Sequence, residues 1–576
     1  MLPFHARCAE IAASRLALGR SVTLSAVALS AVILSAVALS ACSGSISDAP
    51  SSGGPREVDT APSDVRPAPS GRFSRLTHQQ WENSVRDLLL LNEASGLSQA
   101  FPADARTAGF LFDNHMTSLE TDQVLSAAYA NAAEALAERV STNSAQLARL
   151  LPPDAGGDRE RARAFISSFG ERAFRRPLSN PEIDNLLELY DAGTTLYDDQ
   201  SGFVAGIRVL IEAFLQSPHF LYRIEASTER AGASIPLGDW EMGQRLSFLL
   251  TNTTPDTPLL AAARAGQLST PDQVRAQATR LLSTPGARPA VVGFHDQLLE
   301  FEKYASIQPS PSAYPGVSDS FGASALDSSR SFIEELAFVE QGTFKDLMTS
   351  TRAFVNRDLA SAYGVTGSFG TNLVGVDLPA GQRRGILNQI GFLAANATSV
   401  QPDPIHRGVF VATRVLCRTI AAPPDGVPPL PPVVDGTNRE VVEKHTESSP
   451  VCRACHETQI NPFGFPFENY DATGAYRSMD NGHPVDARTT PRLDGAELEV
   501  DNSLELADAL SESPEAHECF VSHLLEYAFG RERGPLDEGL VAELTQASLS
   551  DTPIVDLMVR IATSAAFMTR STEELP

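Results

Sequence analysis

Residues 448–477 read SSPVCRACHETQINPFGFPFENYDATGAYR and contain the run CRACH, from Cys452 to His456. A Cys-x-x-Cys-His run is the covalent attachment signature of a c-type haem. On a helix, Cys452 and Cys455 lie at i and i+3 and His456 at i+4, so all three side chains share one face. Two thioethers can then hold the porphyrin edge while the imidazole reaches the iron. The run therefore predicts haem c on Cys452 and Cys455, with His456 as the proximal iron ligand.

The residues that flank this run predict a short helix around it. Ser449 is suited to cap a helix, and Pro450 fits its first turn. Asn461-Pro462 is expected to stop the helix, because a residue before proline avoids the helical conformation. A redox dithiol and half of a zinc site remain open as alternative interpretations of the two cysteines.

The first 42 residues have the pattern of a bacterial lipoprotein signal. Three arginines precede an apolar run, residues 22–39, which ends at Ser40-Ala41-Cys42 and resembles a lipobox. We predict a signal peptide over residues 1–41 and lipid attachment at Cys42. A transmembrane anchor is the alternative, because the apolar run is nearly long enough to span a bilayer.

The segment that follows, residues 42–71, is rich in serine, proline, glycine and aspartate and is expected to be a disordered tether. This arrangement predicts an exported protein that a lipid holds at the outer membrane or on the periplasmic face, or displays at the cell surface. Ser43, by its similarity to the corresponding residue of known lipoproteins, favours the outer membrane. The formal net charge of −26 argues against nucleic acid as a partner.

The chain has six cysteines, and disulfides persist in proteins that are exported from the cytoplasm. Cys8 and Cys42 belong to the signal, and two more cysteines belong to the haem motif. Cys417 and Cys519 remain, one on each side of the motif. We predict a disulfide between them, which would close a loop that contains the whole haem segment. Two buried free thiols are the alternative.

The hydrophobic pattern after residue 71 is helical almost throughout. Thr77 with Gln80 and Ser179 with Glu182 form capping boxes ahead of amphipathic runs. Strand signals are few and are limited to residues 484–500. The sequence has no phosphate-binding glycine loop and no Gly-x-Ser-x-Gly motif. The pattern predicts a mainly α protein of several modules, with a small cytochrome-c-like haem segment near the C-terminus.

Several segments of the chain resemble a set of bacterial domains of unknown function. These are RLTHQQWENSVRDLL, FGERAFRRPLSNPEIDNLLELY, FVNRDLASAYG, HRGVFVATRVLC and CFVSHLLEYAFGRE, together with the segment around the CRACH run. The set comprises five domains, numbered in the DUF fifteen-eighties and fifteen-nineties, which occur together in large exported proteins with a Cys-x-x-Cys-His segment. The module numbered fifteen-ninety-two is the central one.

The resemblance implies a succession of helical modules along the mature chain. It places a first module at residues 72–145, a second at 155–216, a central module at 217–365, a haem-type module at 380–480 and a C-terminal module at 500–572. Cytochrome-c-like character accompanies the family and strengthens the haem prediction. The family also has cysteines at the positions of Cys417 and Cys519, which agrees with the predicted disulfide.

The distal iron ligand is marked less clearly than the proximal one. Small cytochromes use a methionine or a histidine there, and the candidates in this chain are Met479, His445, His483, His517, His523 and Met558. His445 lies seven residues before Cys452 and resembles a family position, so it ranks first. Arg477 is a candidate contact for a haem propionate through a charge-assisted bond. Alternatively, it pins the loop that follows the motif.

Three functions are compatible with these features. The first is an extracytoplasmic lipoprotein that transfers electrons through a c-type haem to an unidentified redox partner protein. The second is a haem-assisted oxidoreductase that acts on an unidentified substrate. The third is a surface assembly or binding protein without haem. No catalytic group adjoins the motif in the sequence, so electron transfer requires the fewest assumptions and enzymatic activity stays an open question.

Overall fold

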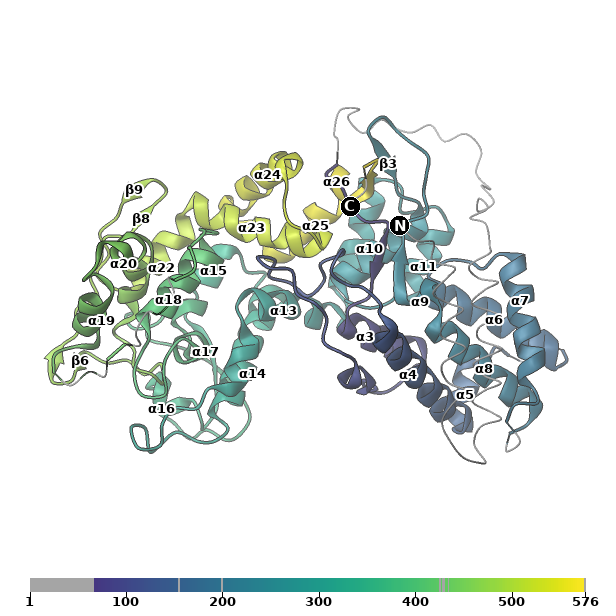
Figure 1. Ribbon diagram of the computed structural model, residues 1–576, viewed down its shortest axis with the longest axis horizontal. Coiled ribbons are helices and arrows are strands. Elements are labelled where there is room, and N and C mark those ends of the chain that lie inside the picture. The colour runs from purple at the N-terminus through teal and green to yellow at the C-terminus, as the bar shows by residue number, and fades with distance from the viewer. Residues whose placement is uncertain are drawn as a thin grey trace. The chain divides into compact units, whose positions relative to one another are not determined.

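The computed structural model describes residues 67–573, except 154–155, 198–199, 424–425, 427–429, 432 and 434 (Figure 1). The predicted signal peptide, the lipidation site Cys42 and the predicted tether up to residue 66 lie outside the described residues. The described part of the chain is mainly α, as predicted, and its strands are short. Within that part, no helix combines the length and the apolar character that crossing a membrane requires.

The chain forms two compact units. Among the described residues, the first unit comprises Val85–Phe101 and Asp122–Leu221. Its centre is α8 (Gly202–Gln216), which is buried over most of its length and packs against α4, α6, α7 and α9. Gly206 allows α8 to approach α7 closely, because a Cβ there would overlap the ring of Tyr190. The other helices of this unit are α4 (Gln123–Ser141), α5 (Ser144–Leu150), α6 (Asp158–Phe174), α7 (Asn180–Gly193) and α9 (Pro218–Leu221).

The second unit contains the described residues up to Ser84, then Pro102–Thr121, and everything from Tyr222 onward. A single apolar core runs through it from Phe110 to Phe567. Its N-terminal and central helices are α3 (His78–Leu88, the last turns of which belong to the first unit), α10 (Asp239–Leu250), α11 (Thr257–Arg264), α12 (Pro271–Leu282), α13 (Ala287–Leu298), α14 (Phe321–Phe338), α15 (Phe344–Thr349) and α16 (Ala360–Tyr363). Its later helices are α17 (Ile390–Ala395), α18 (Pro404–Phe410), α22 (Ser503–Glu512), α23 (Pro514–Phe529), α24 (Glu538–Leu549), α25 (Ile554–Ala562) and α26 (Ala565–Met568).

The strands of the second unit pair only as two-stranded antiparallel ribbons. Two of these ribbons join distant parts of the chain. In the first, β1 (Phe73–Arg75) pairs with β2 (Tyr222–Ile224). In the second, β10 (Thr569–Ser571) pairs with β3 (Ser234–Pro236). The remaining ribbons are local and are formed by β4 (Arg352–Val355) with β5 (Val374–Asp377), β6 (Met479–Asp480) with β7 (His483–Pro484), and β8 (Arg492–Leu493) with β9 (Ala496–Glu497).

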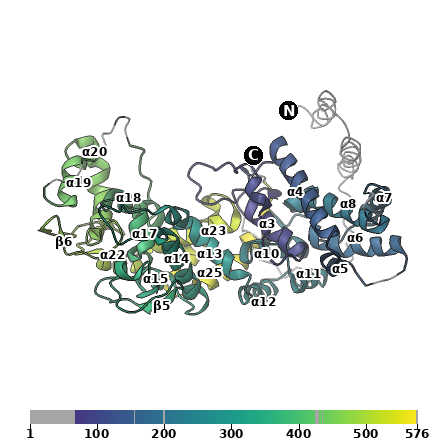
Figure 2. The same ribbon diagram turned by 90° about the horizontal axis from the view of Figure 1, so that it is seen from below.

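The helix that contains Arg407 positions the predicted haem segment. It starts as α18, with Asp403 as its cap, and continues as a π-helical turn, η4 (Val411–Val415). The sequence predicts a regular helix as far as Thr419, but the structure ends it before Cys417, which adopts a left-handed backbone conformation. Figures 1 and 2 both show α18 beside the helices that carry the CRACH run.

Two glycines allow α18 to lie directly against α21 (Asn461–Gly464), which follows the CRACH run. A Cβ on Gly408 would overlap the carbonyl oxygen of Ile460, and a Cβ on Gly464 would overlap that of Pro404. Backbone atoms cannot rotate away as the end of a side chain can. Only glycine at both positions permits this close approach.

We predict that Gly408→Ala lowers the free energy of unfolding by about 3 kcal/mol, because the added methyl group forces the two backbones apart. Urea unfolding of the full chain, followed by far-UV circular dichroism, measures this change. Gly293→Ala in α13 is the matched control, since a Cβ there meets no atom within 4 Å. The control should be neutral or stabilising by up to about 1 kcal/mol. Equal stability of the two variants would disprove the close packing.

Candidate functional site

A chain of short helices carries the CRACH run. These are α19 (Asn438–Thr446), α20 (Pro450–Cys455), the π-helical turn η5 (His456–Ile460), α21 and the 3-10 turn η6 (Phe465–Phe467). The Ser449 side chain caps α20, since its oxygen accepts a hydrogen bond of 3.2 Å from the Cys452 backbone N–H. Pro450 occupies the first turn, where its missing N–H costs no hydrogen bond. Both predictions about the start of this helix are confirmed.

The prediction that Asn461-Pro462 ends the helix is wrong. The chain continues through η5 directly into α21, with Pro462 in the first turn of that helix. The π-helical turn inserts an extra residue and thereby restarts the hydrogen-bond ladder at Asn461. Because a new first turn begins there, proline is tolerated. The turn also places Asn461 where its side chain reaches His456.

The two motif cysteines are unpaired thiols, and both are half-buried. The hydroxyl of Ser449 donates a hydrogen bond of 3.1 Å to the Cys452 sulfur. The ligand atoms of Cys452, Cys455 and His456 do not all lie within 4.8 Å of one another, so they do not form a compact metal cluster. Among the described residues, the structure therefore supplies no further ligands for half of a zinc site. A spread set of two thiols and an imidazole suits a porphyrin, which is bonded at its edge and at its central iron.

The His456 imidazole is oriented by a hydrogen-bond network. Its Nδ1 lies 3.2 Å from Oδ1 of Asn461. The amide nitrogen of Asn461 donates to Oε1 of Glu447 at 2.8 Å and to Oγ1 of Thr446 at 3.0 Å. A carboxylate only accepts hydrogen bonds, so the amide orientation is determined and Oδ1 must face the imidazole. Nδ1 of His456 consequently carries the hydrogen.

With Nδ1 protonated, Nε2 of His456 presents a lone pair. No residue in the described part of the chain accepts or donates a hydrogen bond at this atom. A metal-bound histidine has the same arrangement, with one nitrogen on the metal and the other donating to a fixed acceptor. The donor set of Cys452, Cys455 and His456 therefore fits haem c. Sequence reasoning missed Asn461 as part of this site, although an amide five residues after the histidine was a usable signal.

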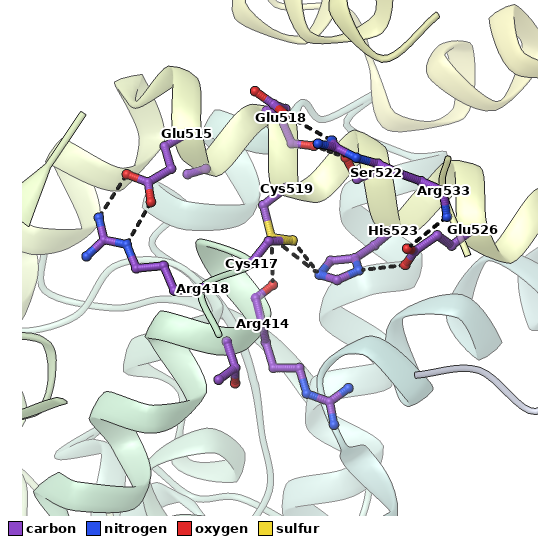
Figure 3. Close-up of a disulfide and its surroundings, with 12 residues drawn as sticks. Arg414, Cys417, Arg418, Glu515, Glu518, Cys519, Ser522, His523, Glu526 and Arg533 are labelled. Atoms are coloured by element: carbon purple, nitrogen blue, oxygen red, sulfur yellow. Dashed lines mark hydrogen bonds and ion pairs between the residues drawn. A yellow bond between two sulfur atoms is a disulfide. The ribbon is translucent and has the colours of Figure 1, made fainter. Parts of the chain in front are cut away.

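Cys417 and Cys519 form a disulfide with a Cα–Cα distance of 5.4 Å, as predicted (Figure 3). The bond joins the end of η4 to α23. The CRACH segment, including α19 and α20, lies within the loop that this disulfide closes. The C-terminal helices are thus fastened covalently to the helix that packs on α21.

Five family models match the chain, in order and without overlap. Each is described as a protein of unknown function: DUF1587 over residues 74–142, DUF1595 over 161–225, DUF1592 over 237–365, DUF1588 over 383–480 and DUF1585 over 497–567. The chain belongs to the proteins built from these five families. The DUF1588 model, which spans the CRACH run, carries the name PSCyt3, which suggests a cytochrome-related domain. Comparisons with curated proteins and with solved structures give no match.

Within the DUF1588 module, His445 lies half-buried in the last turn of α19, next to Thr446 of the hydrogen-bond network. Three other candidates for the distal ligand are engaged elsewhere. His517 is buried and bonds to Ser548 and to the Ser511 carbonyl, Met558 is buried among the C-terminal helices, and His523 faces the disulfide. Met479 and His483 are exposed on the β6–β7 ribbon. His445 keeps its rank as the first candidate.

The guanidinium of Arg477 bonds to residues of the loop in which it lies. It donates to the Glu468 carbonyl at 3.0 Å, lies 3.2 Å from the Glu468 carboxylate and forms a salt bridge with Asp480. The backbone N–H of Arg477 also donates to the Asn469 carbonyl at 2.7 Å. These contacts support the interpretation that Arg477 pins the loop. They leave the proposed propionate contact without support.

Glu468 is a buried carboxyl group inside the DUF1588 module, and only 1% of it is exposed. Burial raises its pKa to about 7, although Arg477, Arg407 and a hydrogen bond from Asn438 lower it. Because the pKa in the folded protein exceeds the ordinary value of 4.5, protonated Glu468 favours the folded state. This stabilisation is complete below about pH 4.5 and is lost as the pH rises through about 7.

We predict that Glu468→Gln reduces the pH dependence of stability, because glutamine stays neutral at every pH. The free energy of unfolding of the parent protein should fall between pH 5 and pH 8 by on the order of 2 kcal/mol more than that of the variant. Urea titrations at four pH values measure this difference. Glu497→Gln, at an exposed position on β9, is the control and should follow the parent protein. A parallel fall in the Glu468 variant would contradict the prediction.

Proposed function

We propose that the chain is an extracytoplasmic electron-transfer protein that carries a c-type haem on its DUF1588 module. The observation that supports this proposal is the state of His456, whose Nδ1 donates to Asn461 while Nε2 remains open; Cys452 and Cys455 of the same motif are unpaired thiols. A redox dithiol needs no oriented histidine at this position. A zinc site needs ligand atoms that converge, and these do not.

In this proposal each residue of the motif has one role. Cys452 and Cys455 bind the porphyrin edge through thioether bonds, and His456 coordinates the iron through Nε2. The bound haem supplies one-electron redox chemistry. Asn461 holds the imidazole in one tautomer and one orientation, and an acceptor at Nδ1 increases the basicity of the ligand. Thr446 and Glu447 fix Asn461 in turn.

Electron transfer is favoured over catalysis by what surrounds the motif. In the part of the chain that the structure describes, the side chains that contact His456 and its network are an amide, a hydroxyl and one carboxylate. This set orients a ligand, and within the described residues neither Cys452 nor Cys455 is hydrogen-bonded to His456, so no nucleophile is paired with a base. The remaining modules then provide a scaffold and a docking surface for a redox partner protein. The acidic net charge of −26 suits a partner with a basic docking face.

We predict covalent haem when the full chain is produced in a bacterial host that has the haem-attachment machinery. The reduced protein should show a c-type α band, and the denatured band on a gel should retain haem peroxidase activity. Cys452→Ser combined with Cys455→Ser should abolish both signals, because both thioether bonds are lost. A folded but colourless parent protein would overturn the proposal in favour of a surface assembly protein without haem.

Asn461→Leu and His445→Ala test the roles of the residue that orients His456 and of the first distal-ligand candidate, and His483→Ala is the control. Asn461→Leu should retain covalent haem and raise its midpoint potential, because the imidazole loses its acceptor and becomes a weaker donor to ferric iron. His445→Ala should change the low-spin spectrum if this histidine is the distal ligand, whereas His483→Ala, at an exposed position, should leave it unchanged. An unchanged potential in the Asn461 variant would show that the network does not act on the iron.

We further propose that a lipid on Cys42 anchors the protein to a membrane, preferentially the outer membrane. The supporting feature is the sequence Ser40-Ala41-Cys42 at the end of an apolar run. Cys42→Ala is expected to leave the precursor uncleaved, or to release the protein from the membrane fraction. Metabolic labelling with a fatty acid, followed by fractionation, measures both outcomes. Normal maturation and membrane association of the variant would exclude the anchor.

A further inference from the structure

The disulfide between Cys417 and Cys519 has surroundings that a purely structural crosslink does not need. Cys417 is exposed, whereas Cys519 is 2% exposed. His523 lies beside both sulfurs, and its Nε2 is 3.3 Å from the sulfur of Cys417 and 3.3 Å from that of Cys519. Figure 3 shows the imidazole directed at the S–S bond. Cys417 is therefore the residue of the pair that lies at the surface, whereas Cys519 is covered.

The hydrogen on Nε2 of His523 can be assigned from the chemistry of its partners. Neither sulfur of a disulfide carries a hydrogen, so Nε2 must be the donor to both. On the opposite side of the ring, Nδ1 lies 3.4 Å from Oε2 of Glu526; because a carboxylate only accepts, this contact is a hydrogen bond when the ring carries a hydrogen on both nitrogens. Cys519, His523 and Glu526 all lie on α23, with His523 four residues after Cys519 and three before Glu526, so one helix face presents all three.

This order of groups is that of an activated thiol site: a sulfur, a histidine within hydrogen-bond reach, and a carboxylate behind the histidine. A donor at 3.3 Å also stabilises a thiolate far more than it stabilises a disulfide, because the thiolate is charged. Cys417 itself has a backbone φ of 52°, a left-handed conformation that is unfavourable for a residue with a Cβ. The N–H of Arg418 donates to the Ala412 carbonyl at 2.8 Å, so this conformation belongs to the end of the helix and not to the crosslink.

The flanking segments are held by other contacts, so reduction would not release them. Arg418, the residue after Cys417, forms two hydrogen bonds of 2.7 and 2.8 Å to the carboxylate of Glu515 on α23. Arg414 bonds to Glu300 at 2.9 Å. The two cysteines would therefore stay close together after reduction, as a reversible dithiol requires.

We propose that Cys417, Cys519, His523 and Glu526 form a thiol–disulfide exchange centre whose substrate is a dithiol reductant. A thiolate of the reductant attacks the sulfur of Cys417, the residue of the pair that is exposed. A new S–S bond forms between the reductant and Cys417, and the bond between Cys417 and Cys519 breaks. The electron pair stays on Cys519, whose thiolate accepts the hydrogen bond from Nε2 of His523.

The second thiol of the reductant then attacks the other sulfur of the reductant, which is bonded to Cys417. The bond between that sulfur and Cys417 breaks. The reductant leaves as a disulfide, and two electrons have moved to Cys417 and Cys519. The proton of the second thiol passes to the sulfur of Cys417, and Cys519 remains a thiolate that accepts the hydrogen bond from His523. Oxidation of the centre is the same sequence in reverse with a disulfide partner. The proposal does not depend on haem and stands independently of the function proposed above.

The rate of reduction of the native, full chain by dithiothreitol tests this proposal. Alkylation and mass spectrometry of the Cys417 and Cys519 peptides give the reduced fraction over time, without denaturant. We expect His523→Phe to slow reduction at least tenfold, because the leaving thiolate loses its donor. His523→Gln, which keeps a donor, should recover part of the rate. Glu518→Gln is the control, since this residue lies on α23 but bonds to Arg533.

Attack on the sulfur of Cys417 is tested separately. In Cys519→Ser, the thiol of Cys417 should form a mixed disulfide with an aromatic disulfide reagent at least tenfold faster than the thiol of Cys519 does in Cys417→Ser. Circular dichroism confirms that each variant is folded. The proposal is wrong if the parent disulfide resists dithiothreitol until denaturant is added, if His523→Phe is reduced at the parent rate, or if the two single thiols react equally.

Discussion

The arrangement of the DUF1588 module depends on one buried cation. Arg407 on α18 is fully buried, and its guanidinium donates to four backbone carbonyl groups, those of Leu393, Phe467, Tyr470 and Asp471. Burial lowers its pKa to about 10, because a site without water disfavours the charged form of the side chain. Arginine is the side chain that can satisfy several carbonyl groups at once with a rigid set of donors. The loop after the CRACH run is thereby held to α17 and α18.

The helix formed by α18 and η4 links the CRACH segment to the disulfide. Near its start, Gly408 lies against the backbone of α21, which follows the motif and contains the amide that orients His456. Just beyond its end, Cys417 is bonded to α23. A displacement of this helix would therefore act on the CRACH segment and on the disulfide together. The disulfide thus joins the DUF1588 module, in which the backbones of α18 and α21 lie in contact, to the DUF1585 module.

Several parts of this architecture could be predicted from local sequence. Helical periodicity, the Ser449 cap and Pro450 depend on interactions within a few residues, and the structure agrees with each. The pairing of Cys417 with Cys519 followed from a count in which four of six cysteines already had roles. The continuation of the helix through Pro462 was missed, because it requires a π-helical turn that tertiary packing against α18 stabilises.

The sequence by itself determined the helical class of this protein, its family membership and the residues of its haem-type motif, because each of these is encoded by spacing along the chain. Only the tertiary structure decided that the guanidinium of Arg477 bonds within its own loop, that Asn461 determines the tautomer of His456, and that His523 faces the disulfide. These properties depend on which donor meets which acceptor, and most of the partners lie within ten residues of each other. Hydrogen bonds act over about 3 Å, so spacing along the chain names possible partners, and the folded conformation of the loop or helix decides which of them meet.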